Sequence, residues 1–148
     1  MFTTDLLAAE RIRLDLDAGS KKRVLEEIAT LLQGGEDEDL NSIFDHLLER
    51  ERLGSTGMGH GVALPHARMP GLVQARGGFI RLASPVDYGA IDGEPVDLVF
   101  GLLVPGQATQ EHLQLLASLA SLFHDTAVCQ RLRSASDPHE ILNTLLTA

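Results

Sequence analysis

The residues best suited to chemistry lie together in residues 50–68, which read RERLGSTGMGHGVALPHAR. Near the end of this run a histidine, His66, follows a proline. Pro65 has a fixed φ and keeps Leu64 extended, so the backbone that carries the histidine is stiff. A neutral imidazole nitrogen is an adequate nucleophile near neutral pH because the free side chain titrates at about pH 6.5. The pattern therefore predicts that His66 is a positioned nucleophile.

Groups that can bind an anion precede and follow this histidine. They are hydroxyls, alternate glycines and arginines, namely Ser55, Thr56, Gly57, Gly59, Gly61, Arg50 and Arg68. Alternate glycines allow positive φ and bring backbone N–H groups close to a ligand, which can form an anion-binding nest. Phosphoryl transfer needs mainly positioning and charge stabilisation, which these groups offer. The run lacks the Gly-Lys-Ser/Thr ending of a nucleotide-binding loop, so the sequence predicts phosphoryl chemistry without nucleotide binding.

Four segments carry a resemblance to a known family. Residues 54–66 (GSTGMGHGVALPH) strongly resemble the phosphorylation site of the enzyme IIA domains of the bacterial phosphoenolpyruvate-dependent phosphotransferase system, mannitol/fructose type. The similarity continues through residues 90–100 (AIDGEPVDLVF), 111–113 (EHL) and 129–133 (CQRLR), and covers the chain from the first helix on. Within this family the chain looks most like the nitrogen-regulatory subgroup.

The resemblance implies roles for particular residues. The family's phosphoryl acceptor matches His66, a second histidine beside it matches His112, and a nearby arginine matches Arg50. By the same resemblance the phosphoryl donor is the phosphohistidine of the histidine phosphocarrier protein, and neither a cofactor nor a metal is expected. The predicted phosphoryl-binding residues are the hydroxyls and glycines of the loop: Ser55, Thr56, Gly57, Gly59 and Gly61.

Each candidate also has an ordinary structural explanation. If it has no role in the chemistry, His112 simply covers or caps its helix. Arg50 is then explained by the helix dipole, which stabilises any cation near a helix C-terminus. Ser55 and Thr56 would form a turn, because hydroxyls readily bond the local backbone. His60 stands where the family usually has asparagine, and Arg68 where lysine is common. His60 is interpreted as a solvent-facing substitution, and Arg68 keeps the positive charge.

The resemblance implies two of three possible functions, and the histidines alone suggest the third. The predicted one is a regulatory phosphoryl-transfer protein of the nitrogen-regulatory branch, whose downstream protein targets the sequence does not name. The alternative is a IIA component that passes the phosphoryl group to a fructose/mannitol-type IIB protein for sugar uptake. A remote third is a zinc hydrolase with His60, His66 and His112 as ligands. Against it, a histidine pair five residues apart in a glycine loop is not a helix-borne ligand pair, and no nearby acid is an obvious base.

The composition restricts the possible partners. The chain has 148 residues, a formal net charge of −9 and 44% hydrophobic residues. Such an acidic surface repels phosphate backbones and anionic lipids, so nucleic acid and membrane partners are not expected, whereas docking to a basic patch on another protein is. A single cysteine, an N-terminus without a basic start, and no run of about 20 apolar residues predict a cytoplasmic protein without membrane insertion.

The elements that must position the site follow from hydrophobic periodicity. Alternation predicts a strand over 12–16, and apolar stripes predict two helices, one starting after Ser20 and one after the acidic residues 36–39. Strands are expected at 61–64, 78–83 and 96–104, the last nearly all apolar and therefore central. Helices are expected over about 109–123, 126–134 and 138–147. The order predicts one domain over residues 1–148, an α/β sandwich with a mixed β-sheet flanked by helices on both sides.

Overall fold

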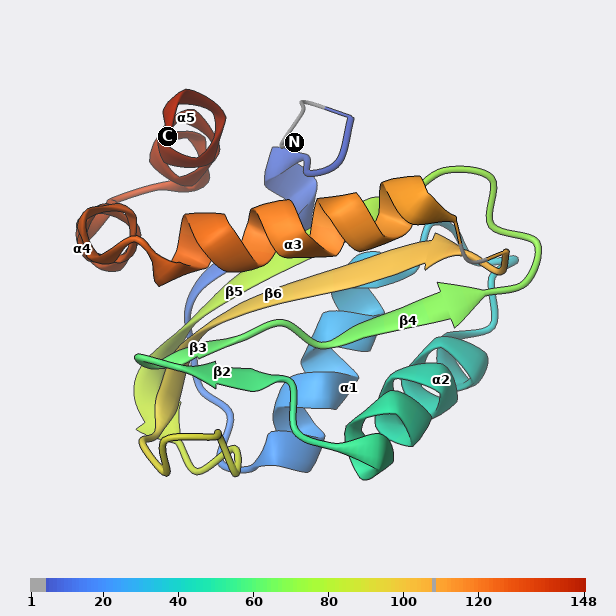
Figure 1. Ribbon diagram of the computed structural model, residues 1–148, viewed down its shortest axis with the longest axis horizontal. Helices are drawn as coiled ribbons and strands as arrows, with labels where there is room; N and C mark the ends of the chain where they lie inside the picture. The colour runs from blue at the N-terminus through green and yellow to red at the C-terminus, as the bar shows by residue number, and fades with distance from the viewer. Residues whose placement is uncertain (1–4, 108) are drawn as a thin grey trace.

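Six strands form one mixed sheet at the centre of the computed structural model, which describes residues 5–107 and 109–148 (Figure 1). They are β1 (Ile12–Leu16), β2 (Gly57–Gly59), β3 (Val62–Ala63), β4 (His66–Met69), β5 (Arg76–Val86) and β6 (Val96–Pro105). The order across the sheet is β1-β5-β6-β3-β2, and β4 also pairs with β6. β6 runs antiparallel to β5 and parallel to both β3 and β4. The predicted mixed sheet is therefore confirmed.

Helices cover both faces of this sheet (Figure 1). On one face lie α1 (Lys21–Leu32) and α2 (Leu40–Leu53), and on the other lie α3 (Gln110–His124), α4 (Thr126–Ser134) and α5 (Pro138–Thr147). A short 3-10 turn, Ala9–Arg11, precedes β1. Each α-helix begins at a side-chain cap that accepts a backbone N–H bond, supplied by Ser20, Asp39, Thr109, Asp125 and Asp137. The sandwich with helices on both sides thus agrees with the prediction.

Two hydrophobic cores result, one on each face of β6. The strand is buried along nearly its whole length, so alternate residues enter opposite cores. On the α3 side the rings of Phe79 and Phe100 lie 6.3 and 5.7 Å from that of Phe123. On the α1 side the helix packs directly on the strand, because a Cβ at Gly101 would lie 2.5 Å from Cγ2 of Ile28. These contacts make the sheet a rigid support for the residues at its exposed edge.

The edge of β6 that faces β3 and β4 carries the residues of interest. β3 pairs with Leu98 and Val99, and β4 pairs farther along with residues from Leu102 onward. Pro65 separates the two short strands and cannot donate a hydrogen bond, but its carbonyl accepts one from the N–H of Leu102 at 3.0 Å. The chain therefore stays extended through the proline, and His66 begins β4.

The sequence located most elements, although it missed two. The strands at 12–16 and 96–104 and the last three helices lie within a residue of their predicted bounds. β5 extends past the predicted 78–83 to residues 76–86, and neither β2 nor β4 was predicted as a separate strand. Within the described residues, no helix is long and apolar enough to cross a membrane.

Candidate functional site

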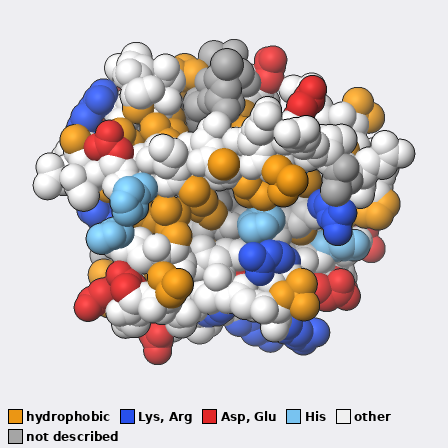
Figure 2. Space-filling model, in the orientation of Figure 1, with side chains coloured by type: hydrophobic (Ala, Val, Ile, Leu, Met, Phe, Trp, Pro, Cys, Tyr) orange, Lys and Arg blue, Asp and Glu red, His pale blue; other side chains and the backbone are white. Residues whose placement is uncertain are grey.

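A groove of about 800 Å³ opens between α2, β4 and α3. Figure 2 shows this face, where a histidine and a basic side chain lie next to each other in the hollow below α3, with hydrophobic side chains nearby. The lining comprises His46, Glu49, Arg50, Arg52, Leu53, His66, Ala67, Arg68, Val104, Thr109, His112, Leu113 and Leu116. The groove thus brings together His66, His112 and Arg50, which are distant in the sequence.

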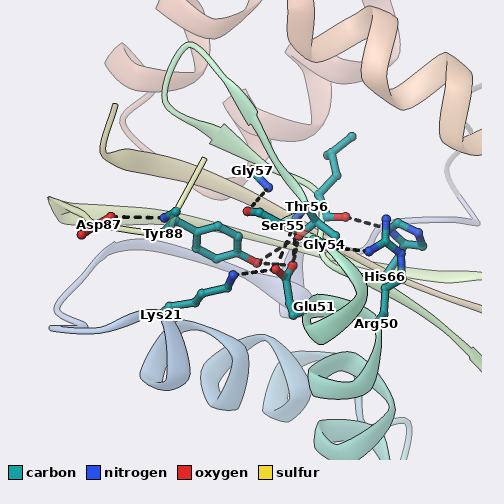
Figure 3. Close-up of polar contacts among 12 residues, drawn as sticks. Lys21, Arg50, Glu51, Gly54, Ser55, Thr56, Gly57, His66, Asp87 and Tyr88 are labelled. Atoms are coloured by element: carbon teal, nitrogen blue, oxygen red, sulfur yellow. Dashed lines mark hydrogen bonds and ion pairs between the residues drawn. The ribbon is translucent and has the colours of Figure 1, made fainter. Parts of the chain in front are cut away.

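A hydrogen bond to the segment that joins β3 and β4 fixes the position of the ring proton of His66. Its Nδ1 lies 2.9 Å from the carbonyl oxygen of Leu64 (Figure 3). A carbonyl can only accept a hydrogen bond, so Nδ1 carries a proton, and in the neutral ring Nε2 then has the lone pair. Burial lowers the pKa of His66, and the charge of Arg50 lowers it further, against opposing contributions from Leu64 and Glu51. The ring is therefore neutral at pH 7, with Nε2 as a nucleophile.

Arg50 places a positive charge next to this histidine. It belongs to the last turn of α2, where the helix dipole also stabilises a positive charge. Its Nη1 donates to the carbonyl oxygen of Gly54 at 2.8 Å, which fixes the guanidinium beside the loop that follows the helix (Figure 3). A guanidinium has five N–H donors, so Arg50 can hold this carbonyl and still bind an anion.

His112 lies in the first turn of α3, on the other wall of the groove. Its backbone N–H is already used, since it donates to the hydroxyl of the cap residue Thr109 at 3.4 Å. Its Nδ1, however, is buried and has no hydrogen-bond partner among the described residues. An unpaired buried polar atom is costly and uncommon in folded proteins. This cost weighs against a merely structural explanation of His112, because a side chain kept only for the fold would not leave a buried nitrogen unpaired.

The groove is more basic than the chain as a whole. Three arginines line it, Arg50, Arg52 and Arg68, against one acid, Glu49. The chain carries a net charge of −9, so the excess acids lie elsewhere on the surface. Local positive charge attracts phosphoryl oxygens. The predicted docking of this acidic chain to a basic partner surface would therefore use residues outside the groove.

The predicted hydroxyl pair faces two different ways. The side chain of Thr56 is buried, and its hydroxyl donates to the carboxylate of Glu51 beside the hydroxyl of Tyr88 (Figure 3). The hydroxyl of Ser55 is exposed at the loop and accepts the N–H of Gly57 at 3.0 Å. Both hydroxyls thus stabilise the loop, and phosphoryl binding by either side chain stays a prediction.

The glycines of the loop do not surround His66. Gly57 packs on Ala90, where an added Cβ would lie 2.8 Å from the alanine methyl group. Gly59 and Gly61 have φ of 98° and 80° and form the turn of the β2–β3 hairpin, which lies at the opposite end of the β3–β4 segment from the tip of β4 (Figure 1). The groove lining includes none of the three. In the structure, Gly59 and Gly61 thus serve the hairpin and Gly57 serves packing, and phosphoryl binding by the three glycines stays a prediction.

His60 sits between these glycines and away from the groove. Its backbone N–H donates to Asp92 at 3.0 Å, and its ring lies 5.6 Å from the ring of His124, edge to face. His60, His66 and His112 therefore do not converge, and no group of three or more metal-ligating side chains occurs in residues 5–107 and 109–148. This separation removes the geometric basis of the zinc-hydrolase alternative.

Sequence reasoning missed one part of the site's surroundings, the buried acid Glu51. Its side chain is 3% exposed and pairs with Lys21 at 2.8 Å. A signal for it was present, because Ile43, Leu47 and Glu51 are the buried residues of α2 and recur every four positions. An acid on the apolar stripe of a helix indicates a buried polar cluster.

Comparisons with known proteins show the family to which this chain belongs. The chain belongs to the family described as phosphoenolpyruvate-dependent sugar phosphotransferase system, EIIA 2, which matches residues 5–148. It is 47% identical over 131 residues to the nitrogen regulatory protein of Pseudomonas aeruginosa, covering 88% of this chain and 85% of that protein. It is 42% identical to the nitrogen regulatory protein of Bradyrhizobium diazoefficiens, covering 96% of this chain and 93% of that one.

A solved structure extends the similarity to three dimensions. The crystal structure of the nitrogen regulatory protein IIA-Ntr from Neisseria meningitidis superposes with a TM-score of 0.91 at 44% identity, covering 95% of this chain and 97% of that one. The resemblance to the mannitol/fructose-type IIA family, and within it to the nitrogen-regulatory subgroup, is therefore confirmed.

Proposed function

We propose that this chain accepts a phosphoryl group on Nε2 of His66 from the phosphohistidine of the histidine phosphocarrier protein. The observation that carries the proposal is the bond from Nδ1 of His66 to the Leu64 carbonyl, which leaves Nε2 as the free nitrogen of a ring that lines the groove. The lowered pKa supports it, because a protonated ring has no lone pair to offer. Membership of a phosphotransferase family supplies the reaction class.

The transfer needs no proton to move. The lone pair of Nε2 forms a bond to the phosphorus while the nitrogen–phosphorus bond of the donor breaks, and the donor imidazole keeps that electron pair. His66 retains its proton on Nδ1, so the phosphorylated ring gains a positive charge, which the carbonyl of Leu64 stabilises. Arg50 and an N–H of His112 donate hydrogen bonds to the three phosphoryl oxygens and so stabilise the negative charge on them during transfer. These two residues are the proposed stabilising groups.

The proposal is tested by phosphoryl labelling. Phosphoenolpyruvate with the two general upstream proteins of the system is expected to label the chain at one site per molecule. The bond is expected to be labile in acid and stable in base, as a phosphoramidate is and a phosphoserine is not. Intact-mass measurement before and after acid treatment checks both points, and a chain that takes no label, or an acid-stable one, contradicts the proposal.

We further propose that the phosphoryl group regulates a protein partner in the cytoplasm and does not mainly feed sugar uptake. The similarity of this chain to nitrogen regulatory proteins supports a regulatory role. Leu53 and Leu113 flank the groove with 85% and 67% of their surface exposed, which suits docking of a partner over His66. A phosphoryl group placed there would add negative charge among arginines and change the fit of such a partner.

Pull-downs are expected to separate the two destinations of the phosphoryl group. A regulatory partner must bind the two states with different affinity, since only differential affinity makes a switch. His66→Ala, which cannot carry phosphate, and His66→Asp, a crude mimic of its charge, are therefore expected to retain different amounts of one partner. If no partner distinguishes them and a sugar-specific IIB protein removes the phosphate rapidly, the regulatory proposal is wrong and the acceptor assignment stands.

A further inference from the structure

The buried carboxylate of Glu51 lies at the centre of a cluster on the inner side of the site. It accepts hydrogen bonds from the hydroxyl of Tyr88 at 2.9 Å and from the N–H of Thr56 at 3.2 Å, besides the hydroxyl of Thr56 (Figure 3). The ammonium of Lys21 pairs with its other oxygen at 2.8 Å and lies 4.6 Å from the centre of the Tyr88 ring. Burial and the nearby carboxylate raise the pKa of Tyr88, so its hydroxyl stays a donor.

This cluster connects to His66 through two further hydrogen bonds. The carbonyl of Thr56, whose N–H is held by Glu51, accepts the N–H of Leu64 at 3.0 Å. The carbonyl of Leu64 in turn accepts the Nδ1 proton of His66 at 2.9 Å. The peptide groups on both sides of Leu64 are therefore fixed in series from α2. Pro65 has no N–H, so the peptide group between Leu64 and Pro65 takes part in this series only through the Leu64 carbonyl.

The same helix end also fixes the other polar group of the site. Arg50 donates to the carbonyl of Gly54, and Glu51, the next residue, binds Thr56. The last turn of α2 therefore holds both ends of the short loop 54–56. The loop cannot shift without moving the guanidinium on one side and the Leu64 peptide on the other.

From this geometry we propose that Glu51 is a positioning residue for phosphoryl transfer, a role that rests on the proposed function of His66. Glu51 holds Thr56, Thr56 holds the Leu64 peptide, and the Leu64 carbonyl keeps the proton on Nδ1 so that Nε2 remains the nucleophile. If Thr56 is released, the carbonyl moves, the ring populates the other tautomer, and Nε2 becomes protonated. A ring in that tautomer cannot attack through Nε2.

The test compares substitutions at Glu51 by the tautomer of His66. Glu51→Ala removes every bond of the cluster to the carboxylate, so nitrogen NMR of the isotope-labelled imidazole is expected to report a mixture of tautomers in place of the Nδ1–H form. The transfer rate at saturating donor protein is expected to fall about tenfold or more. The half-saturating donor concentration is expected to change much less than the rate, because Glu51 itself does not line the groove.

Two companion variants separate positioning from charge and from stability. Glu51→Gln keeps the length and one acceptor oxygen for the N–H of Thr56, and is expected to restore most of the Nδ1–H signal and of the rate. Tyr88→Phe removes one donor but leaves the bonds from Glu51 to Thr56 intact, and is expected to show the wild-type tautomer even if its melting temperature falls. Glu51→Asp, too short to reach Thr56 in the same way, replaces Glu51→Ala if that variant does not fold.

The outcomes are distinguishable. A wild-type tautomer and rate in folded Glu51→Ala or Glu51→Asp overturns the proposal, and so does a Glu51→Gln variant as impaired as the alanine one, which would point to charge alone. The tautomer is measured without any phosphoryl donor. A wild-type chain that fails to accept phosphate therefore contradicts the proposed function while leaving the positional coupling of Glu51 and His66 measurable.

Discussion

Replacing His66 with alanine is expected to reduce phosphoryl labelling of this chain to background, the largest effect of any single substitution in the groove. Alanine has no lone pair to form the bond to phosphorus, and His112, with its Nδ1 buried, is expected to bind phosphoryl oxygens without accepting the group. Incorporation of phosphate after incubation with phosphoenolpyruvate and the upstream proteins measures the effect. The fold is expected to persist, since His66 is only half-buried.

His46 provides the matched control for this experiment. It lines the same groove, and its Nδ1 likewise lies 2.7 Å from a carbonyl oxygen, that of Ser42. Unlike His66 it is carried by the middle of a helix, away from the Leu64–Pro65 connection. His46→Ala is therefore expected to be labelled as fully as the unchanged protein. Labelling of His66→Ala at the wild-type level would show that the acceptor has been assigned to the wrong residue.

The fold was accessible from the sequence where one periodicity continues over many residues. The apolar run that became β6 and the stripes that became α1 and α2 could be predicted because burial on one or both faces leaves a pattern in neighbouring positions. β2 and β4 are three and four residues long, too short for a pattern. What makes them strands is pairing with β3 and β6, which is a contact between distant segments.

The candidate site divides in the same way. His66, Arg50 and His112 could be predicted from a local motif and a family resemblance, and the structure places all three on one groove. The glycines were assigned to phosphoryl binding because alternate glycines suit both an anion nest and a tight hairpin. The role of these glycines in the hairpin became visible only from contacts with a distant segment, the packing of Gly57 on Ala90 and the hydrogen bond from the N–H of His60 to Asp92.

The buried cluster lay beyond local reasoning. Its members Thr56 and Tyr88 are 32 residues apart, and Glu51 and Tyr88 are 37 apart. No spacing rule joins a hydroxyl after one helix to a phenol before the central strand. Glu51 itself continues the apolar stripe of α2, so its burial had a local signal. Its partners had none, and the role of Glu51 therefore emerged from the hydrogen bonds.

Replacing His112 with leucine is expected to slow phosphoryl transfer about a hundredfold while leaving the chain as stable as before or more so. The rate falls because a preorganised donor to the developing charge is lost, and removal of one such donor typically costs a factor of this size. Stability is maintained because Nδ1 of His112 is buried without a partner, and an apolar side chain of similar size removes that unpaired atom from a groove that Leu116 and Val104 also line. Single-turnover transfer kinetics and thermal unfolding check the two halves.

His112→Gln is the control for the chemical part of this effect. Glutamine keeps an N–H donor on the same helix turn, so its transfer rate is expected to lie between those of the leucine variant and the unchanged protein. Phosphate still appears on His66 in both variants, because neither removes the nucleophile. Wild-type rates of transfer and of phosphate loss in His112→Leu would return this histidine to a structural role. A leucine variant that loses clearly more than about 0.5 kcal/mol of unfolding free energy would show that the ring contributes to the fold, since substitutions without a packing or bonding role stay within that range. Slow transfer combined with undiminished stability is the result expected of a residue kept for its chemistry.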